Sequence, residues 1–320
     1  MMCERCGICA LSCKLPCVHF TKGRHMSPKA HSLARHSVKF LLNETFLSTL
    51  KNISTHLSDF LKSREPESLH QYRINIRMAR SICVEFSAFI DKKRKKTLED
   101  LLKVLQKETN DMRDIDVFLE YIEAYKKRVD SSLSNEFESI KAKLEVEKEH
   151  AYKAFKSKYT ETFQADIVAK LHAIESSETL SFPKSKQKLF LSLQEIFESR
   201  LKKIAKSSKK LNSSASNAQF HTLRLHYKKL RYTSDALNLE QFSKSFKPIQ
   251  NAFGSVQDKN SQIERIKRYN TEHNKCLEHI IALLEEELVC DKQACITKSS
   301  QKNIRKMRDN VREIFTSKKK

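Results

Sequence analysis

The sequence is short of the residues that turn and interrupt a chain. It has 3 Gly, 5 Pro and no Trp in 320 residues, and only Gly254 follows Gly23. Sheet-rich folds need glycine at tight turns and bulges, whereas helices joined by short polar loops do not. The scarcity of glycine therefore predicts an all-α fold.

Long apolar runs are absent as well. No uninterrupted apolar segment approaches the roughly 18 to 20 residues that a membrane span needs, and the N-terminus lacks the apolar region of a secretory signal. We therefore expect no membrane span and a cytoplasmic location. In that compartment the 9 cysteines should be largely reduced.

Acidic residues are few relative to basic ones. The chain has 39 Asp and Glu against 61 Lys and Arg, which gives a formal net charge of +22 and a pI of about 9.6. So much charge of one sign repels itself in a folded chain and favours an anionic partner. Nucleic acid, anionic lipid and polyphosphate all fit this requirement, and charge alone does not choose between them.

Composition divides the chain into three zones. Residues 1–30 hold 5 of the 9 cysteines, and residues 36–287 form a succession of amphipathic helical patterns. A polar break in that second zone predicts two halves, at about 36–176 and 184–287. Residues 296–320 carry 9 Lys or Arg and predict a basic C-terminal helix, over about 300–315, followed by a frayed tail.

Two distant segments repeat one pattern. Between Leu69 and Ile90, and again between Phe220 and Leu237, apolar or small residues recur in steps of 3 and 4, which predicts a seam buried against a neighbouring helix. One residue after the first four seam positions of each segment runs a basic stripe, and the two stripes have the same spacing. The stripes are His70, Arg73, Arg77 and Arg80 in the first segment, and His221, Arg224, Lys228 and Arg231 in the second.

Helix geometry makes each stripe a possible track for a linear anion. The four positions fall within an arc of about 80° and span about 15 Å along the axis. Arginine forks two N–H groups onto phosphate oxygens, while lysine acts as a mobile point charge. The alternative is a solvated face neutralised by acids on neighbouring helices, in which each histidine is half-buried and bonded to a backbone carbonyl.

The two segments resemble the signature helices of the CHAD family, the conserved-histidine α-helical domains. Residues 110–117 resemble the family's Arg-Asp-x-Asp-Val turn, and residues 249–258 resemble its Leu-Gly-x-x-x-Asp segment. The resemblance covers roughly residues 36–285. It implies two pseudo-symmetric antiparallel helical-bundle halves around a basic groove, polyphosphate binding and, in many bacteria, association with polyphosphate granules. One departure is Met78, where the family commonly has a second arginine.

The resemblance also implies a set of site residues. Asp114 and Asp258 are expected to be supporting acids that aim the arginines. We interpret these acids, with Asp111 and Asp116, as helix-start or salt-bridge groups rather than metal ligands for hydrolysis, and we expect no catalytic residue and no cofactor. Nucleic-acid binding and a helical scaffold are the alternatives. The polyphosphate-binding residues are expected to be His70, Arg73, Arg77, Arg80, His221, Arg224, Lys228, Lys229, Arg231 and Tyr232.

The N-terminal cysteines have the spacing of a ferredoxin-type cluster run, C-x2-C-x2-C-x3-C. However, Lys14 stands where that motif usually has proline, and no second cluster motif follows. A zinc site that also uses Cys17 or His19 is a second interpretation. We favour a disordered leader or a mis-assigned start, with Met26 as the true beginning, and expect no metal. The metal candidates are Cys3, Cys6, Cys9 and Cys13.

Overall fold

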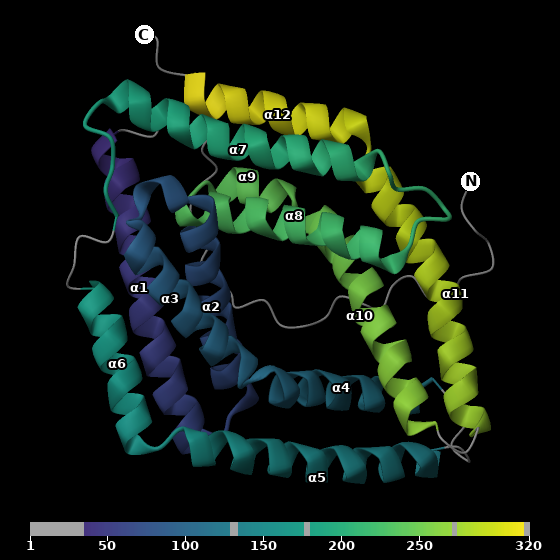
Figure 1. Ribbon diagram of the computed structural model, residues 1–320. Helices are drawn as coiled ribbons and strands as arrows, with labels where there is room; N and C mark the ends of the chain where they lie inside the picture. Colours follow the sequence, from purple (N-terminus) through teal and green to yellow (C-terminus); the bar gives the residue numbers. More distant parts are fainter. Residues whose placement is uncertain (1–34, 129–133, 176–179, 271–273, 317–320) are drawn as a thin grey trace, which may run out of the picture. The chain divides into compact units, whose positions relative to one another are not determined.

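The chain is helical in every stretch that can be described. These stretches of the computed structural model (Figure 1) are residues 35–128, 134–175, 180–270 and 274–316. Within them lie twelve α-helices, one 3-10 turn and no strand, so the predicted all-α fold is confirmed. The pseudo-symmetry of two halves stays a prediction. By its internal contacts the chain forms two units, 1–31 and 32–320. The described residues all belong to the second unit.

The helices follow one another with short connections. Their bounds are α1 Arg35–Ser63, α2 Pro66–Glu85, α3 Lys92–Lys107, α4 Asn110–Lys126, α5 Ser134–Lys158, α6 Glu161–Glu175, α7 Lys186–Ser208, α8 Asn217–Ala236, α9 Glu240–Ser245, α10 Lys247–Tyr269, α11 Lys275–Lys298 and α12 Gln301–Thr316. The 3-10 turn is Ser87–Phe89. The N-terminal cysteines and their candidate metal site lie outside the described residues.

Polar caps begin several helices in place of glycine-rich turns. Asp91 accepts hydrogen bonds from the backbone N–H groups of Lys93 and Arg94 at the start of α3, at 3.0 and 3.1 Å. Ser216 and Gln219 form a capping box at the start of α8. Each such cap satisfies donors that the first turn leaves free, and contributes about 1 kcal/mol. Local side chains therefore define these helix starts without glycine.

Both predicted seams are buried. On α2, Leu69, Tyr72 and Ile76 are fully enclosed, and on α8 the same holds for Leu223 and Tyr227. Contacts with α1 and α3 cover the α2 seam, while α7 and α10 pack against α8. Full burial of a large apolar side chain contributes about 1.5–3 kcal/mol. The seam therefore fixes the rotation of each helix about its axis and leaves the basic stripe at the edge of the packed surface.

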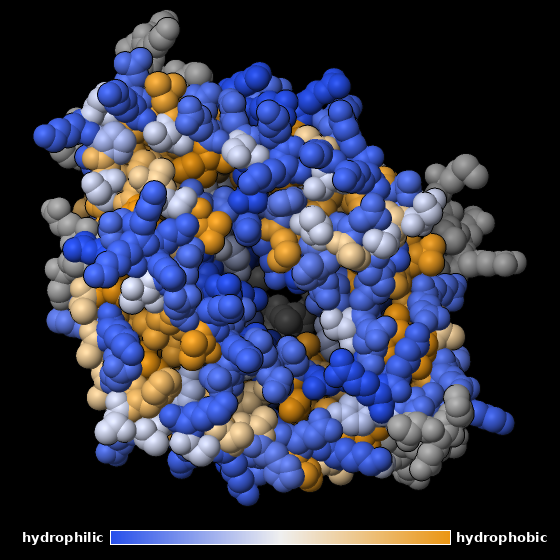
Figure 2. All heavy atoms as spheres, in the orientation of Figure 1, coloured by the Kyte–Doolittle hydropathy of each residue, from blue (hydrophilic) through white to orange (hydrophobic). Residues whose placement is uncertain are grey.

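Four helices enclose a hollow in this unit. Helix α2 packs against α8, α8 against α10, and α4 against α2. The circuit closes between α4 and α10, where Phe118 stacks on Tyr269 with ring centroids 6.2 Å apart and Arg265 donates to the backbone oxygen of Asp114. Figure 2 shows this face hollowed at its centre, with hydrophilic residues around the opening.

A buried ion pair joins α2 to α7. Arg200 Nε donates to Glu85 Oε2 at 3.1 Å, a second guanidinium nitrogen donates to Oε1, and the two side chains are only 7% and 4% exposed. His226 of α8 lies beside them, with Nδ1 at 3.1 Å from Arg200 Nη1. Burial, reinforced by the charge of Arg200, lowers the pKa of His226. This cluster ties α7 and α8 to the C-terminal end of α2.

Candidate anion-binding site

Uncharged partners position the α2 stripe. Arg73 Nη1 donates to Thr109 Oγ1 at 2.8 Å and to the backbone oxygen of Gln106 at 3.2 Å, while Arg80 donates to the side-chain oxygen of Gln106. Arg77 Nε donates to the backbone oxygen of Arg73 at 3.3 Å. The end of α3 and the start of α4 therefore orient the guanidinium groups of Arg73 and Arg80, and the backbone of α2 holds that of Arg77, in each case through an uncharged partner.

The α8 stripe is held in a similar way. His221 Nδ1 lies 2.5 Å from the side-chain oxygen of Gln257, and Arg231 Nη1 donates to the side-chain oxygen of Gln250 at 3.2 Å. Arg231 also lies 3.6 Å from a carboxylate oxygen of Asp235. Among the described residues, this is the one ion pair within 4 Å made by either stripe. Close ion pairs among the described residues therefore do not neutralise the other cations of the two stripes.

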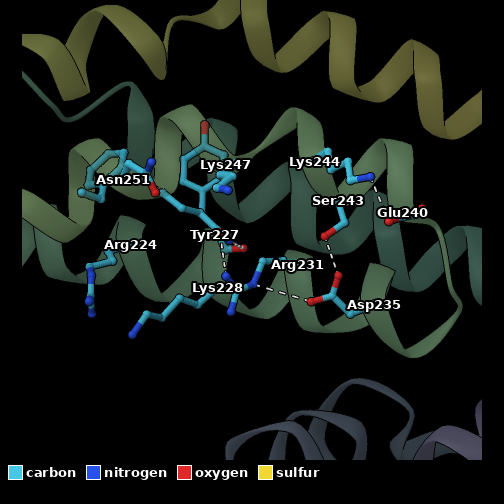
Figure 3. A pocket seen from close by; sticks show the side chains of 12 residues that line it. Arg224, Tyr227, Lys228, Arg231, Asp235, Glu240, Ser243, Lys244, Lys247 and Asn251 are labelled. Carbon is cyan, nitrogen blue, oxygen red and sulfur yellow. Dashed lines mark hydrogen bonds and ion pairs between the residues drawn. The ribbon is translucent and has the colours of Figure 1, made fainter. Parts of the chain in front are cut away.

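The two stripes converge between α2 and α8. Arg77 lies close enough to Arg224 and Lys228 for its charge to lower the pKa of both, after the larger effect of burial. Arg224 Nε is buried without a hydrogen-bond partner among the described residues. Figure 3 shows Arg224 and Lys228 extended in the same direction from α8. Helices from distant parts of the sequence thus bring their cations to one place.

Acids face this cluster without forming close ion pairs with it. Burial raises the pKa of Asp258 on α10, while Arg224 and Lys228 oppose that rise. Burial likewise raises the pKa of Asp114 on α4, and Arg73 opposes it. Both side chains still reach solvent, as expected for groups that line a concave surface. We call this region the cationic hollow. Its cations are Arg73, Arg77, Arg113, Arg224 and Lys228, and its acids are Asp114 and Asp258.

A pocket of about 430 Å³ adjoins the hollow where α8, α9 and α10 meet (Figure 3). Its acids are already engaged, because Asp235 lies beside Arg231 and Glu240 pairs with Lys244 at 2.8 Å. Lys247, at the start of α10, adds a further cation. The cations that line the pocket are Arg224, Lys228, Arg231, Lys244 and Lys247.

Sequence patterns missed Arg113, Lys244 and Lys247. Arg113 lies within residues 110–117, which resemble the family turn, but it belongs to neither basic stripe. It stands near His70 and Arg73, since its charge contributes to the lowered pKa of each. Lys244 lies within the short helix α9 and Lys247 begins α10, and no periodic pattern marks either lysine.

Of the ten predicted site residues, three line the pocket, namely Arg224, Lys228 and Arg231. Two of the others, Lys229 and Tyr232, make different contacts on α8. Burial and the charge of Arg200 lower the pKa of Lys229, which places it on the side of α8 that faces the Glu85–Arg200 pair. Tyr232 is buried, and Arg231 lies over its ring at 5.0 Å from the centroid. Neither side chain lines the pocket. Tyr232 therefore supports the guanidinium group of Arg231 from behind.

Two residues of the stripes, Lys228 and His70, are not fully protonated at neutral pH. Burial, the charge of Arg224 and other nearby cations lower the pKa of Lys228 to about 7. Burial and Arg113 lower the pKa of His70 below its ordinary value of 6.5. Lys228 is therefore partly neutral in the free protein, and His70 is a neutral imidazole. An anion that enters the hollow favours the protonated form of Lys228.

This predicts a pH-dependent affinity. Binding of tripolyphosphate should strengthen as the pH falls from about 8.5 to about 6.5, because Lys228 then gains its proton in the free protein. Lys228→Arg should weaken this dependence, since arginine stays charged throughout. Calorimetric titrations of the wild type and of Lys228→Arg across the pH series measure the two pH profiles. The ionisation of the ligand affects both profiles equally, so it cancels when they are compared. Identical pH profiles for the two proteins would contradict a role for Lys228.

Within the described residues, no helix is long and apolar enough to cross a membrane, and no group of three or more His, Cys, Asp or Glu is placed to hold a metal ion. The fold and the site define an all-α protein with a hollow whose cations come from α4 and from two helices of matching pattern, α2 and α8.

Comparisons with known proteins identify the family to which this chain belongs. The family model of the CHAD domain matches residues 44–267, so the chain belongs to the CHAD family, as the signature helices predicted. PptA from Streptomyces chartreusis is similar in structure, with a TM-score of 0.65 at 13% identity over 82% of this chain and 98% of that one. The crystal structure of the CHAD domain from the plant Ricinus communis gives 0.57 at 14% identity, over 91% and 96%. A search of curated proteins found no match.

Proposed function

We propose that this chain is a non-catalytic protein that binds inorganic polyphosphate in the cationic hollow and associates with polyphosphate granules. The observation that carries the proposal is the meeting of Arg77 with Arg224 and Lys228, with no carboxylate within 4 Å of any of the three among the described residues. Asp258 offsets only part of the repulsion among these cations, and the remaining repulsion weakens the folded state unless an anion supplies further negative charge. A chain of phosphates supplies it at every unit.

The aromatic residues of the site favour polyphosphate over nucleic acid. Tyr227 and Phe253 line the pocket, but they are only 0% and 1% exposed. Proteins that bind single strands present ring faces on which bases stack. The cations here offer phosphate contacts without such a platform, and phosphate contacts alone suit a polymer that consists of phosphates.

The acids of the hollow favour binding over hydrolysis. Asp258 has Arg224, Lys228 and Lys259 as its cationic neighbours, and Arg73 is the foremost such neighbour of Asp114. Carboxylates in these surroundings are suited to orienting guanidinium and ammonium groups. A divalent cation that activates water would compete with those groups for the same oxygens.

A salt series tests the proposal. Purified protein should bind long-chain polyphosphate with an affinity that falls steeply as salt rises, with a log–log slope of about −0.7 for each phosphate contacted. Contacts from six cations, those of the hollow and Arg231, would give a slope of about −4. Competition with single-stranded and duplex DNA, at equal phosphate concentration and physiological salt, accompanies the series. Displacement of polyphosphate by either DNA would favour the nucleic-acid alternative, and binding of neither polymer would favour the scaffold.

A further inference from the structure

A second group of cations lies on the outer surface of α7 and α12. The C-terminal half of α7 and the N-terminal half of α12 lie side by side, because Gln301 donates to the backbone oxygen of Ala205 at 3.2 Å and Ser208 donates to that of Ser299. At the other end of the pair, Phe315 of α12 packs on α7. The two helices are therefore antiparallel (Figure 1).

The charge of this surface has one sign. Residues 200–210 contain 6 Lys or Arg, residues 298–308 contain 5, and neither segment contains an acid. Eight of these side chains are exposed and form no ion pair within 4 Å among the described residues. We call these eight the basic ridge. They are Lys202, Lys203, Lys206, Lys209, Lys210, Lys302, Arg305 and Lys306.

The residues of the ridge and of the helices that carry it indicate which class of anion the ridge can bind. The apolar residues of α12, Ile304, Met307 and Val311, are buried against the protein, so this helix has no free apolar face to insert into a lipid surface. Neither residues 200–210 nor residues 298–308 contain an aromatic side chain on which a base could stack. Exposed lysines act as mobile point charges and suit a flexible chain of phosphates.

Cations also connect the ridge to the hollow. Lys203 of the ridge lies near Lys229 on α8, and Arg80 of α2 lies near the same lysine, since the charge of each lowers the pKa of Lys229. Arg80 belongs to the same stripe as Arg77, which faces the hollow. A phosphate chain that leaves the hollow can therefore follow positive charge to α7.

We propose that the basic ridge is a second binding surface for the same polyphosphate chain, so that a long chain occupies the hollow and the ridge together while a short one occupies the hollow alone. This inference rests on the proposed function. It assigns a role to α12, which lies beyond the matched residues 44–267. Joining two sites through one ligand raises the apparent affinity without any new contact within either site.

Two variants with equal loss of charge test the ridge. The ridge variant replaces Lys202, Lys206, Lys209, Lys302, Arg305 and Lys306 with glutamine. The control variant replaces six exposed lysines of α3 and α5 with glutamine, and these lysines also form no ion pair within 4 Å among the described residues: Lys92, Lys93, Lys96, Lys103, Lys143 and Lys156. Binding of tripolyphosphate, of long-chain polyphosphate and of duplex DNA is measured for both variants and for the wild type, after circular dichroism has shown equal helical content.

The ridge variant should bind tripolyphosphate as the wild type does but lose at least about tenfold in affinity for the long chain, with a salt slope shallower by about 0.7 per lost contact. The control variant should lose much less. Equal long-chain affinity in the two variants would overturn the inference, as would loss of duplex DNA rather than polyphosphate binding in the ridge variant. If the wild type binds neither polyphosphate, the proposed function itself fails, which is a different result.

Discussion

Replacing Arg77, Arg224 and Lys228 with glutamine should lower the affinity for long-chain polyphosphate by about 100-fold or more. A hydrogen bond to a charged group contributes about 1.5–3 kcal/mol, and each of the three cations can supply at least one to a phosphate oxygen. Solvent that reaches the hollow weakens these hydrogen bonds, so the total loss of binding free energy is smaller than the sum of the three contributions. Fluorescence titration with labelled polyphosphate at low salt measures the loss.

The same triple variant should not be less stable than the wild type. Arg77 and Arg224 each oppose the charge of Lys228 in the free protein, so neutral side chains remove repulsion, and the thermal midpoint should stay the same or rise. Replacing Lys92, Lys93 and Lys96 with glutamine removes equal charge from the exposed start of α3 and should change affinity little. A folded triple variant that binds as tightly as this control would contradict the proposed site. Arg77→Lys, which keeps the charge, should retain most of the binding.

Glu85→Gln should destabilise the protein by about 3–5 kcal/mol, because it leaves the charge of Arg200 buried without its carboxylate. His226 lies beside Arg200 and cannot relieve it, since protonation would add a second positive charge. The free energy of unfolding, measured by urea titration and followed by circular dichroism, tests this value. The effect belongs to the fold, since Glu85 and Arg200 do not line the pocket.

Two further variants distinguish the effect of burying an ion pair from the effect of removing a charge. Glu149→Gln removes the exposed pair between Arg64 and Glu149, whose atoms lie 2.5 Å apart, and should leave the urea midpoint nearly unchanged because solvent screens surface pairs. The double change Glu85→Leu with Arg200→Met should recover much of the stability lost in Glu85→Gln, since well-packed apolar residues can replace a buried pair. An equal midpoint shift in Glu85→Gln and Glu149→Gln would show that the buried pair has no special weight.

The part of the site that local periodicity controls was predictable from the sequence. A heptad seam determines which face of a helix is buried, and a stripe one residue later must then stand beside that face. Burial of Leu69 and Tyr72 on α2, and of Leu223 and Tyr227 on α8, follows from this rule. The CHAD resemblance, confirmed by the family match, rested on the same helices.

The rest depends on which helices meet, and periodicity does not contain that information. Arg113 joins the hollow because α4 packs against α2, and Lys247 joins the pocket because α10 begins beside α8. Lys229 follows Lys228 in sequence, yet a step of about 100° around the helix axis turns it toward Arg200 instead. The neutral partners of the arginines, such as Gln106, carry no pattern that marks them in advance.

The closed circuit of α2, α4, α10 and α8 has a consequence for the order of folding. The contact between Phe118 and Tyr269 joins residues far apart along the chain, so the circuit cannot close until the polypeptide has been synthesised beyond α10. A nascent chain therefore has no complete site to occupy. Once the circuit is closed, a ligand that binds only this form stabilises it by mass action. If polyphosphate is bound as proposed, it would act as a late folding ligand that shifts the folding equilibrium toward the closed circuit.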